Sequence, residues 1–154
     1  KYNAKIADFG FCTDIWKCNE DSMRGTPQYM APEQHAGKKY NGQSVDVFAL
    51  GKILFIMVTG KFPFEMATSD SVNYKQIACH RSDEFWKVHL KNMPGNDEFI
   101  SEDLNDLITN MLQYEPNLRP SYLDIMGHPW FSGSTPTYEQ INEELLNKVA
   151  ALNK

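Results

Sequence analysis

The stretch "SVDVFALGKILFIMVTG", residues 44–60, decides the fold, because it is long and almost entirely apolar. Ser44 is a residue type that caps helix N-termini, and Gly60 suits the left-handed residue that ends many helices. A helix that is apolar on all sides lies inside a core and is wrapped by other elements. The stretch also contains Asp46 and Lys52 and is shorter than the roughly 20 residues of a membrane span. We therefore expect the buried helix of a soluble domain and no membrane span.

The chain around this helix predicts a mainly α fold with one short strand at the start. Residues 3–7 alternate polar and apolar side chains, as a strand does. Residues 11–28 are polar and lack helical periodicity, which predicts a long loop. The further segments expected are a helical turn at the start of 31–43, a helix at about 70–79, a loop through 92–99, a helix capped by Ser101 and a short helix from Ser121 and Asp124 to Gly127.

The sequence changes character after Gly133. Thr137 and Gln140 are spaced as a capping box, and an apolar stripe follows at helical spacing, formed by Ile141, Leu145, Val149 and Leu152. We expect this tail to form a helix that packs on the rest of the domain. The alternative is that the stripe binds a partner helix or a regulator.

Composition excludes several classes of protein. The length of 154 residues fits one domain with one core, and 42% hydrophobic residues are ordinary for a globular protein. A net charge of -5 argues against a nucleic-acid partner. Cys12, Cys18 and Cys79 are odd in number and widely spaced, which fits neither a disulfide framework nor a zinc site. We therefore expect a reducing, cytoplasmic setting.

Six motifs occur in the order and spacing of a known family. The chain resembles the C-terminal lobe of a eukaryotic serine/threonine protein kinase, on the motifs Asp8-Phe9-Gly10, "GTPQYMAPE" (25–33), "SVDVFALG" (44–51), "GKFPF" (60–64), "EPNLRP" (115–120) and "HPWF" (128–131). The last motif is most similar to the calcium/calmodulin-dependent and calcium-dependent branch. The resemblance implies a partial kinase domain over 1–131 and a helical tail over 132–154.

The resemblance gives the first motif a role in binding ATP. Asp8 would bind the Mg²⁺ that bridges the ATP phosphates, Phe9 would pack between the two lobes, and Gly10 completes the motif. The alternative is that Asp8 is an ordinary turn residue at the end of a strand.

The loop after Phe11 corresponds to the activation segment of a kinase. Ser22 stands three residues before Gly25 and Thr26, where many kinases carry an activating phosphate. A phosphate there can order the loop against cationic side chains. Ser22 could instead be a plain exposed serine, and Thr13 is a weaker candidate for the phosphate.

The "GTPQYM" motif carries the residues that select the substrate. Thr26 matches the threonine that hydrogen-bonds the catalytic Asp in serine/threonine kinases. Met23, Pro27 and Met30 match positions that line the pocket for the residue just after the phosphorylated one. All three are apolar, so we expect an apolar preference at that substrate position.

Two further matches are structural. Glu33 and Arg119 match a buried ion pair that ties the activation segment to the helical lobe. Asp46 matches a carboxylate that accepts backbone N–H bonds from the catalytic loop, and it also lies where a helix dipole favours an anion.

Several parts of a kinase do not occur in these 154 residues: the Gly-rich phosphate loop, the strand lysine, its partner glutamate and the H-R-D-x-x-x-x-N loop. We therefore expect a fragment that is inactive alone, needs the missing N-terminal part of the kinase domain as a partner, and acts with it on protein substrates. The alternative is a kinase-derived scaffold without catalysis. In either case, the helix at 44–60 would expose apolar area where the missing part packs.

Overall fold

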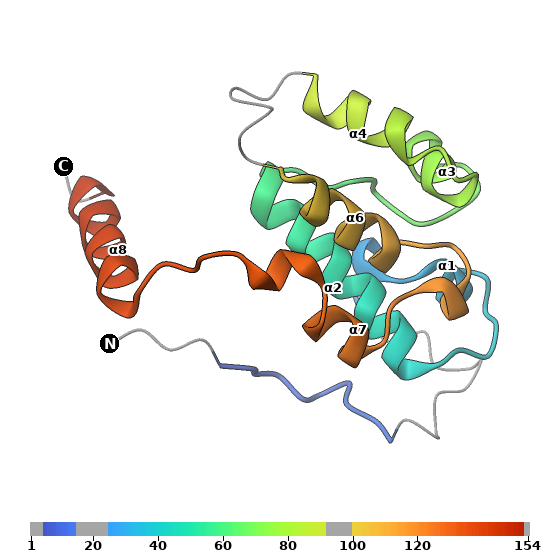
Figure 1. Cartoon of the computed structure of the whole chain (residues 1–154). Helices are drawn as coiled ribbons and strands as arrows, with labels where there is room; N and C mark the ends of the chain where they lie inside the picture. Colours follow the sequence, from blue (N-terminus) through green and yellow to red (C-terminus); the bar gives the residue numbers. More distant parts are fainter. Residues whose placement is uncertain (1–4, 15–24, 92–99, 153–154) are drawn as a thin grey trace.

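The computed structural model describes residues 5–14, 25–91 and 100–152 (Figure 1). Within these ranges the chain is helical and has no strand. The α-helices are α1 (Pro32–His35), α2 (Gly42–Thr59), α3 (Val72–Ala78), α4 (Ser82–Leu90), α6 (Glu102–Met111), α7 (Tyr122–Met126) and α8 (Tyr138–Leu152). Three short 3-10 turns join them: η2 (Pro27–Tyr29), η3 (Pro116–Leu118) and η4 (Pro129–Ser132). The mainly α fold predicted from the sequence is confirmed.

The core of the molecule forms around α2, which runs along α6 in the middle of the bundle (Figure 1). Phe55 of α2 contacts two aromatic rings of α4, with centroids 5.5 Å from Phe85 and 5.3 Å from Trp86. The contact with α6 is equally close, because a Cβ added at Gly51 would lie only 2.8 Å from the Cβ of Met111. Gly51 therefore allows the two helices to approach each other.

Of the two helix ends predicted for α2, the C-terminal one is confirmed and the N-terminal one is not. Gly60 ends the helix with a φ of 69°, the left-handed conformation that was expected. The expectation that Ser44 caps the start is wrong. The helix begins earlier, at Gly42, and the Oδ1 of Asn41 accepts the backbone N–H of Ser44 at 3.2 Å. Asn41 is a better cap here because it precedes the helix, whereas Ser44 is already in its first turn.

The expectation that other elements wrap α2 on all sides is wrong for the described chain, whereas the expectation that part of its apolar surface stays exposed is confirmed. Phe48 and Phe55 are fully buried, but Leu50, Ile53 and Met57 are 52%, 41% and 77% exposed. These three residues form one face, which we call the open face of α2. By length and composition α2 could also cross a membrane, although a third of its 18-residue window is buried in the domain. Its packing against α4 and α6 is that of a core helix.

Two of the expected helices form with the predicted caps. Ser101 accepts the N–H of Leu104 at 3.2 Å at the start of α6. Ser121 and Asp124 form a reciprocal capping box at the start of α7. Both caps satisfy backbone N–H groups that a helix start otherwise leaves without partners.

Helix α4 was not predicted. It buries Phe85 and Trp86 against α2, and the Trp86 indole N–H donates to the Thr109 hydroxyl of α6 at 2.9 Å. The acidic residues Asp83 and Glu84 in its first turn are the signal that could have revealed it. The helix expected at 70–79 is confirmed as α3, capped by Ser71, and the predicted loop at 92–99 lies outside the described residues.

The predicted strand at 3–7 is not present in its described part. Residues 5–7 are exposed and irregular, and residues 3–4 lie outside the described range. A strand is held by hydrogen bonds to a neighbouring strand, and the described ranges offer none. The long loop expected over 11–28 is described only at 11–14 and 25–28.

The tail forms the expected helix but does not pack as expected. Thr137 and Gln140 make the predicted capping bonds, at 2.7 Å and 3.3 Å. Figure 1 shows α8 standing apart from the bundle at the end of an extended connection. Ile141 and Val149 of its stripe are 43% and 47% exposed. The packing prediction is wrong because the connection carries the helix away from the lobe.

Candidate functional site

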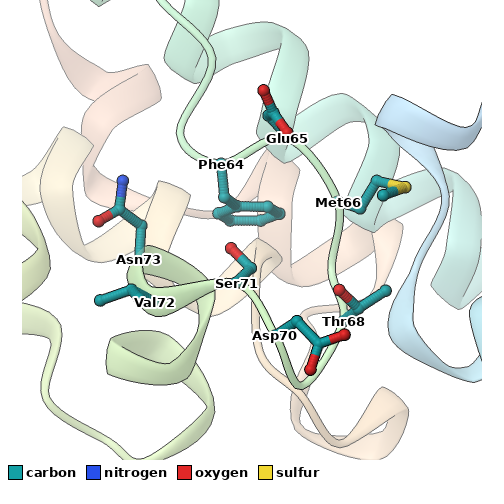
Figure 2. Close-up of a pocket in the computed structure, with 8 residues that line it drawn as sticks. All are labelled: Phe64, Glu65, Met66, Thr68, Asp70, Ser71, Val72 and Asn73. Carbon is teal, nitrogen blue, oxygen red and sulfur yellow. The ribbon is translucent and has the colours of Figure 1, made fainter.

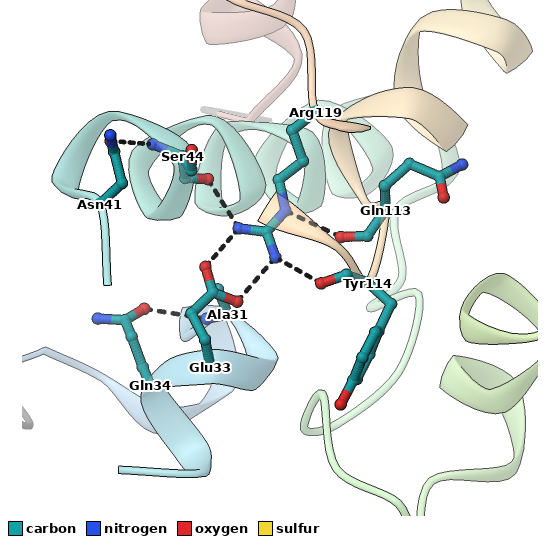
Figure 3. Close-up of polar contacts among 8 residues, drawn as sticks. All are labelled: Ala31, Glu33, Gln34, Asn41, Ser44, Gln113, Tyr114 and Arg119. Atoms are coloured by element: carbon teal, nitrogen blue, oxygen red, sulfur yellow. Dashed lines mark hydrogen bonds and ion pairs between the residues drawn. The ribbon is translucent and has the colours of Figure 1, made fainter. Parts of the chain in front are cut away.

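The best-defined polar centre is an ion pair between α1 and the segment before α7 (Figure 3). Arg119 donates from both terminal nitrogens to the two carboxylate oxygens of Glu33, at 2.7 Å and 2.8 Å. The same guanidinium donates to the backbone carbonyls of Ser44 at 3.0 Å, Gln113 at 2.8 Å and Tyr114 at 3.2 Å. One side chain therefore connects α1, the start of α2 and the chain leading into η3.

This ion pair is almost removed from water. The side chains of Arg119 and Glu33 are 1% and 8% exposed. The guanidinium also lies 4.9 Å from the ring centre of Phe48. Buried charges are tolerated when they are paired and hydrogen-bonded at all their donors, as here. The structure thus brings together the two residues that the sequence pairs.

Thr26, Pro27 and Met30, three of the residues expected to select the substrate, lie in or next to the turn η2. Thr26 is exposed and precedes the turn, and its carbonyl accepts the N–H of Tyr29 at 3.0 Å. The carbonyl of Pro27 accepts the N–H of Met30 at 3.2 Å. Pro27 is exposed, whereas Met30 is 5% exposed. Met23 and Ser22 lie outside the described residues.

A buried lysine lies behind this turn, and no role was predicted for it from the sequence. Lys52 of α2 is fully buried, and its ammonium donates to the backbone carbonyls of Gln28, Phe64 and Glu65. Burial lowers the pKa of Lys52 to about 8. The available signal was a lysine inside an otherwise apolar run. Such a residue must find polar partners within the core.

Asp8 lies in an exposed, irregular segment. It has a φ of 62°, and its Oδ1 accepts the N–H of Gly10 at 3.3 Å. Phe9 beside it is 64% exposed. No group of three metal-binding side chains comes together in the ranges that the structure describes. Mg²⁺ is usually bound by one or two carboxylates together with substrate phosphates, so Asp8 would need such phosphates to complete a site.

Asp46 lies in the first turn of α2 and is exposed. Partial desolvation raises the pKa of its carboxyl group. It precedes Leu50 by four residues, so it lies on the open face of α2. Its carboxylate is therefore next to apolar surface that the described chain leaves uncovered.

A shallow cavity of about 310 Å³ opens beside the loop after α2 (Figure 2). Figure 2 shows Phe64 in the middle of the lining residues, with Ser71 beside its ring and Asp70 farther out. Phe64 and Glu65 line this cavity, and their backbone carbonyls are two of the three acceptors of Lys52. The cavity wall and η2 are thus held by the same side chain.

Two histidines near these elements have pKa values below the ordinary value of an imidazole. Burial lowers the pKa of His35, and the charge of Lys52 lowers it further, although a hydrogen bond to the Pro27 backbone opposes the shift. Burial also lowers the pKa of His89. Neither histidine belongs to the motifs singled out in the sequence.

Comparison with known proteins gives a consistent result. The protein kinase domain family matches residues 1–131. A probable serine/threonine-protein kinase of Dictyostelium discoideum is 36% identical over 146 residues, covering 94% of this chain and 8% of that protein. The serine/threonine-protein kinase SRK2J of Arabidopsis thaliana is 33% identical over 153 residues, covering 93% of this chain and 43% of that protein.

A third relative is human and agrees with the first two. The SNF-related serine/threonine-protein kinase of Homo sapiens is 30% identical over 157 residues, covering 94% of this chain and 19% of that protein. The chain thus spans less than half the length of each of these three relatives. With the motifs, the helical lobe and the buried Glu33–Arg119 pair, the match over 131 of 154 residues means that this chain belongs to the protein kinase domain family.

Proposed function

We propose that this chain is the helical-lobe part of a serine/threonine protein kinase, which transfers the γ-phosphate of ATP to Ser or Thr of protein substrates. The observation that carries the proposal is the match of residues 1–131 to the protein kinase domain family. The relatives reported above are named serine/threonine kinases, which supports the same reading. The phosphate loop, the strand lysine and the catalytic loop have to come from outside these 154 residues.

In this proposal the chain contributes the surface on which the substrate rests. Thr26 hydrogen-bonds the catalytic Asp, which lies outside this chain. Pro27 and Met30 line the pocket for the residue after the acceptor, together with Met23. Pro27 and Met30 are apolar and belong to one hydrogen-bonded turn, which supports an apolar preference at that substrate position.

Asp8 is proposed as one ligand of the Mg²⁺ that accompanies ATP, with Phe9 and Gly10 positioning it. The other ligands are the ATP phosphates and a residue of the catalytic loop, which does not occur in these 154 residues. The metal neutralises charge on the transferred phosphoryl group when it is bound. The exposure of Asp8 supports this role, because its second carboxylate oxygen has no described partner.

Four further assignments belong to the same proposal. Ser22 accepts an activating phosphate. Asp46 anchors the catalytic loop, and its position on the open face of α2 supports a partner segment there. Membership of the calcium/calmodulin-dependent and calcium-dependent branch rests on "HPWF" (128–131) alone, and a cytoplasmic location rests on cysteine usage.

The test compares the 154-residue chain with the full-length protein that carries it. Both are incubated with ATP, Mg²⁺ and peptides in which Ser or Thr precedes an apolar residue. We expect phosphate transfer only by the full-length protein. Asp8→Asn should lower its kcat by about a hundredfold or more, as for the loss of other preorganised electrostatic groups. Asp83→Asn, an exposed carboxylate in α4, is the matched control and should change nothing.

The second candidate is a binding module without catalysis. The observation that favours it is α8, which stands apart with its apolar stripe exposed, as a helix for a partner groove would (Figure 1). A full-length protein that binds partners through residues 134–154 but transfers no phosphate would establish this candidate instead.

A further inference from the structure

Lys52 is placed unusually for a charged residue. It lies in the middle of α2 with no exposed surface, and its described acceptors are three backbone carbonyls. The carbonyls of Phe64 and Glu65 lie 3.1 Å and 3.3 Å from its Nζ. The Nζ also lies 4.2 Å from the ring centre of Phe64. The ring centre of Phe62 lies 5.9 Å from the same Nζ. Among the described residues, carbonyl dipoles and two aromatic rings therefore balance this charge.

Such burial has a cost that the core does not require. Removing an ammonium group from water without a carboxylate partner destabilises its charged form, and the pKa of Lys52 falls to about 8 accordingly. Burial also lowers the pKa of His35, and the charge of Lys52 lowers it further. An apolar side chain would fill the same space at lower cost. What only the lysine provides is the set of hydrogen bonds.

These hydrogen bonds join parts of the chain that are far apart in sequence. The acceptor Gln28 lies inside η2, and the other two acceptors lie in the loop after α2. A second contact supports the same arrangement, because the rings of Tyr29 and Phe62 have centres 5.7 Å apart. Lys52 thus fixes the distance between η2, α2 and the loop that borders the cavity of Figure 2.

We propose that Lys52 is the positioning residue that sets substrate selectivity next to the acceptor, by holding the Gln28 carbonyl and with it Pro27 and Met30. The proposal rests on the proposed kinase function of the chain. Lys52 acts through the backbone of η2 and touches neither substrate nor nucleotide. The substrate feature that it controls is the size and polarity of the residue that follows the phosphorylated Ser or Thr.

The test uses the full-length protein that carries these residues. Lys52→Met keeps a long apolar stem and removes the donors. Two peptides differ only in having Leu or Asp after the acceptor. We expect the ratio of their kcat/KM values to fall about tenfold, the loss typical of a misfitted apolar pocket. The loss should appear as a higher KM for the Leu peptide, with the KM for ATP unchanged. Lys52→Gln, which retains two donors, should restore part of the ratio.

Two controls separate positioning from general stability. Lys75→Met removes an exposed lysine of α3 and should leave the ratio unchanged. Leu104→Ala opens a cavity in the α6 core and should lower the melting temperature without changing the ratio. The proposal is overturned if Lys52→Met leaves the ratio as it is, or if Leu104→Ala changes it equally.

A second measurement is independent of catalysis. Hydrogen exchange at the amides of Tyr29 and Met30, which close η2, should be faster in Lys52→Met than in the unmodified protein. If the unmodified protein transfers no phosphate, the proposed function fails. The exchange measurement still shows whether Lys52 holds η2 in place. Unchanged exchange at both amides then rejects the role of Lys52, and faster exchange supports it.

Discussion

Arg119 shows how much of this lobe depends on single side chains. Removing it leaves the carboxylate of Glu33 buried without a partner, together with three backbone carbonyls that lose their donor. We predict that Arg119→Ala lowers the free energy of unfolding by about 3–5 kcal/mol, the usual loss for a broken buried pair. Chemical denaturation of the chain measures this change.

The matched control is the exposed pair of Arg81 and Glu84, whose side chains are 51% and 56% exposed. Because water screens such a pair, Arg81→Ala should cost less than about 1 kcal/mol. Equal losses in the two variants would mean that burial of the Glu33 pair contributes nothing.

The lowered pKa of Lys52 should be visible in the pH dependence of stability. Its pKa is about 8 in the folded chain and near the ordinary 10.5 when unfolded. Between these values the unfolded chain binds more protons, so this group makes the folded state more stable as the pH rises. We predict that the unmodified chain gains stability relative to Lys52→Met from about pH 8 to about pH 10, measured by urea denaturation. A constant difference across this range would show that Lys52 titrates normally.

At the scale of elements, the start of α2 gives a direct test. Asn41 caps the helix through its side chain, whereas Ser44 lies inside it and contributes a backbone carbonyl to Arg119. We predict that Asn41→Ala lowers the free energy of unfolding by about 1 kcal/mol. Ser44→Ala leaves that carbonyl in place and should have a much smaller effect. Thermal unfolding of both variants measures the two losses. A larger loss for Ser44→Ala than for Asn41→Ala would mean that Ser44 is the cap.

The elements also show how far sequence reasoning reaches. The start of α6 at Ser101 and the end of α2 at Gly60 were predictable, because capping is a local property. Helix α4 was missed because Phe85 and Trp86 are adjacent and make a weak helical period. The open face of α2 cannot be told from its buried face by composition, since both are apolar. Only the neighbours of a helix decide which side is covered.

The candidate site also contains one part that the sequence predicts and one part that it does not. The pairing of Glu33 with Arg119 could be expected from the motifs, since each residue stands in one of them. Lys52 could not, because its acceptors are backbone carbonyls. Every residue has a backbone carbonyl, so the residue types in a sequence do not indicate which carbonyl accepts a hydrogen bond.

At the scale of the whole molecule, α8 is an independent part. It stands apart from the bundle, and Ile141 and Val149 remain exposed (Figure 1). We predict that deleting residues 134–154 leaves the melting temperature of the lobe within about 2 °C, because no large apolar contact is lost. Calorimetry measures this. A clear fall would mean that the tail packs on the lobe after all.

The Arg119 centre has a further consequence for the molecule as a whole. One guanidinium holds a carboxylate of α1, a carbonyl of α2 and two carbonyls before η3. None of these segments can detach alone without leaving a charge stranded in the interior. The lobe should therefore unfold as a single cooperative unit. Local unfolding of α1 should be too rare for a protease to cleave there.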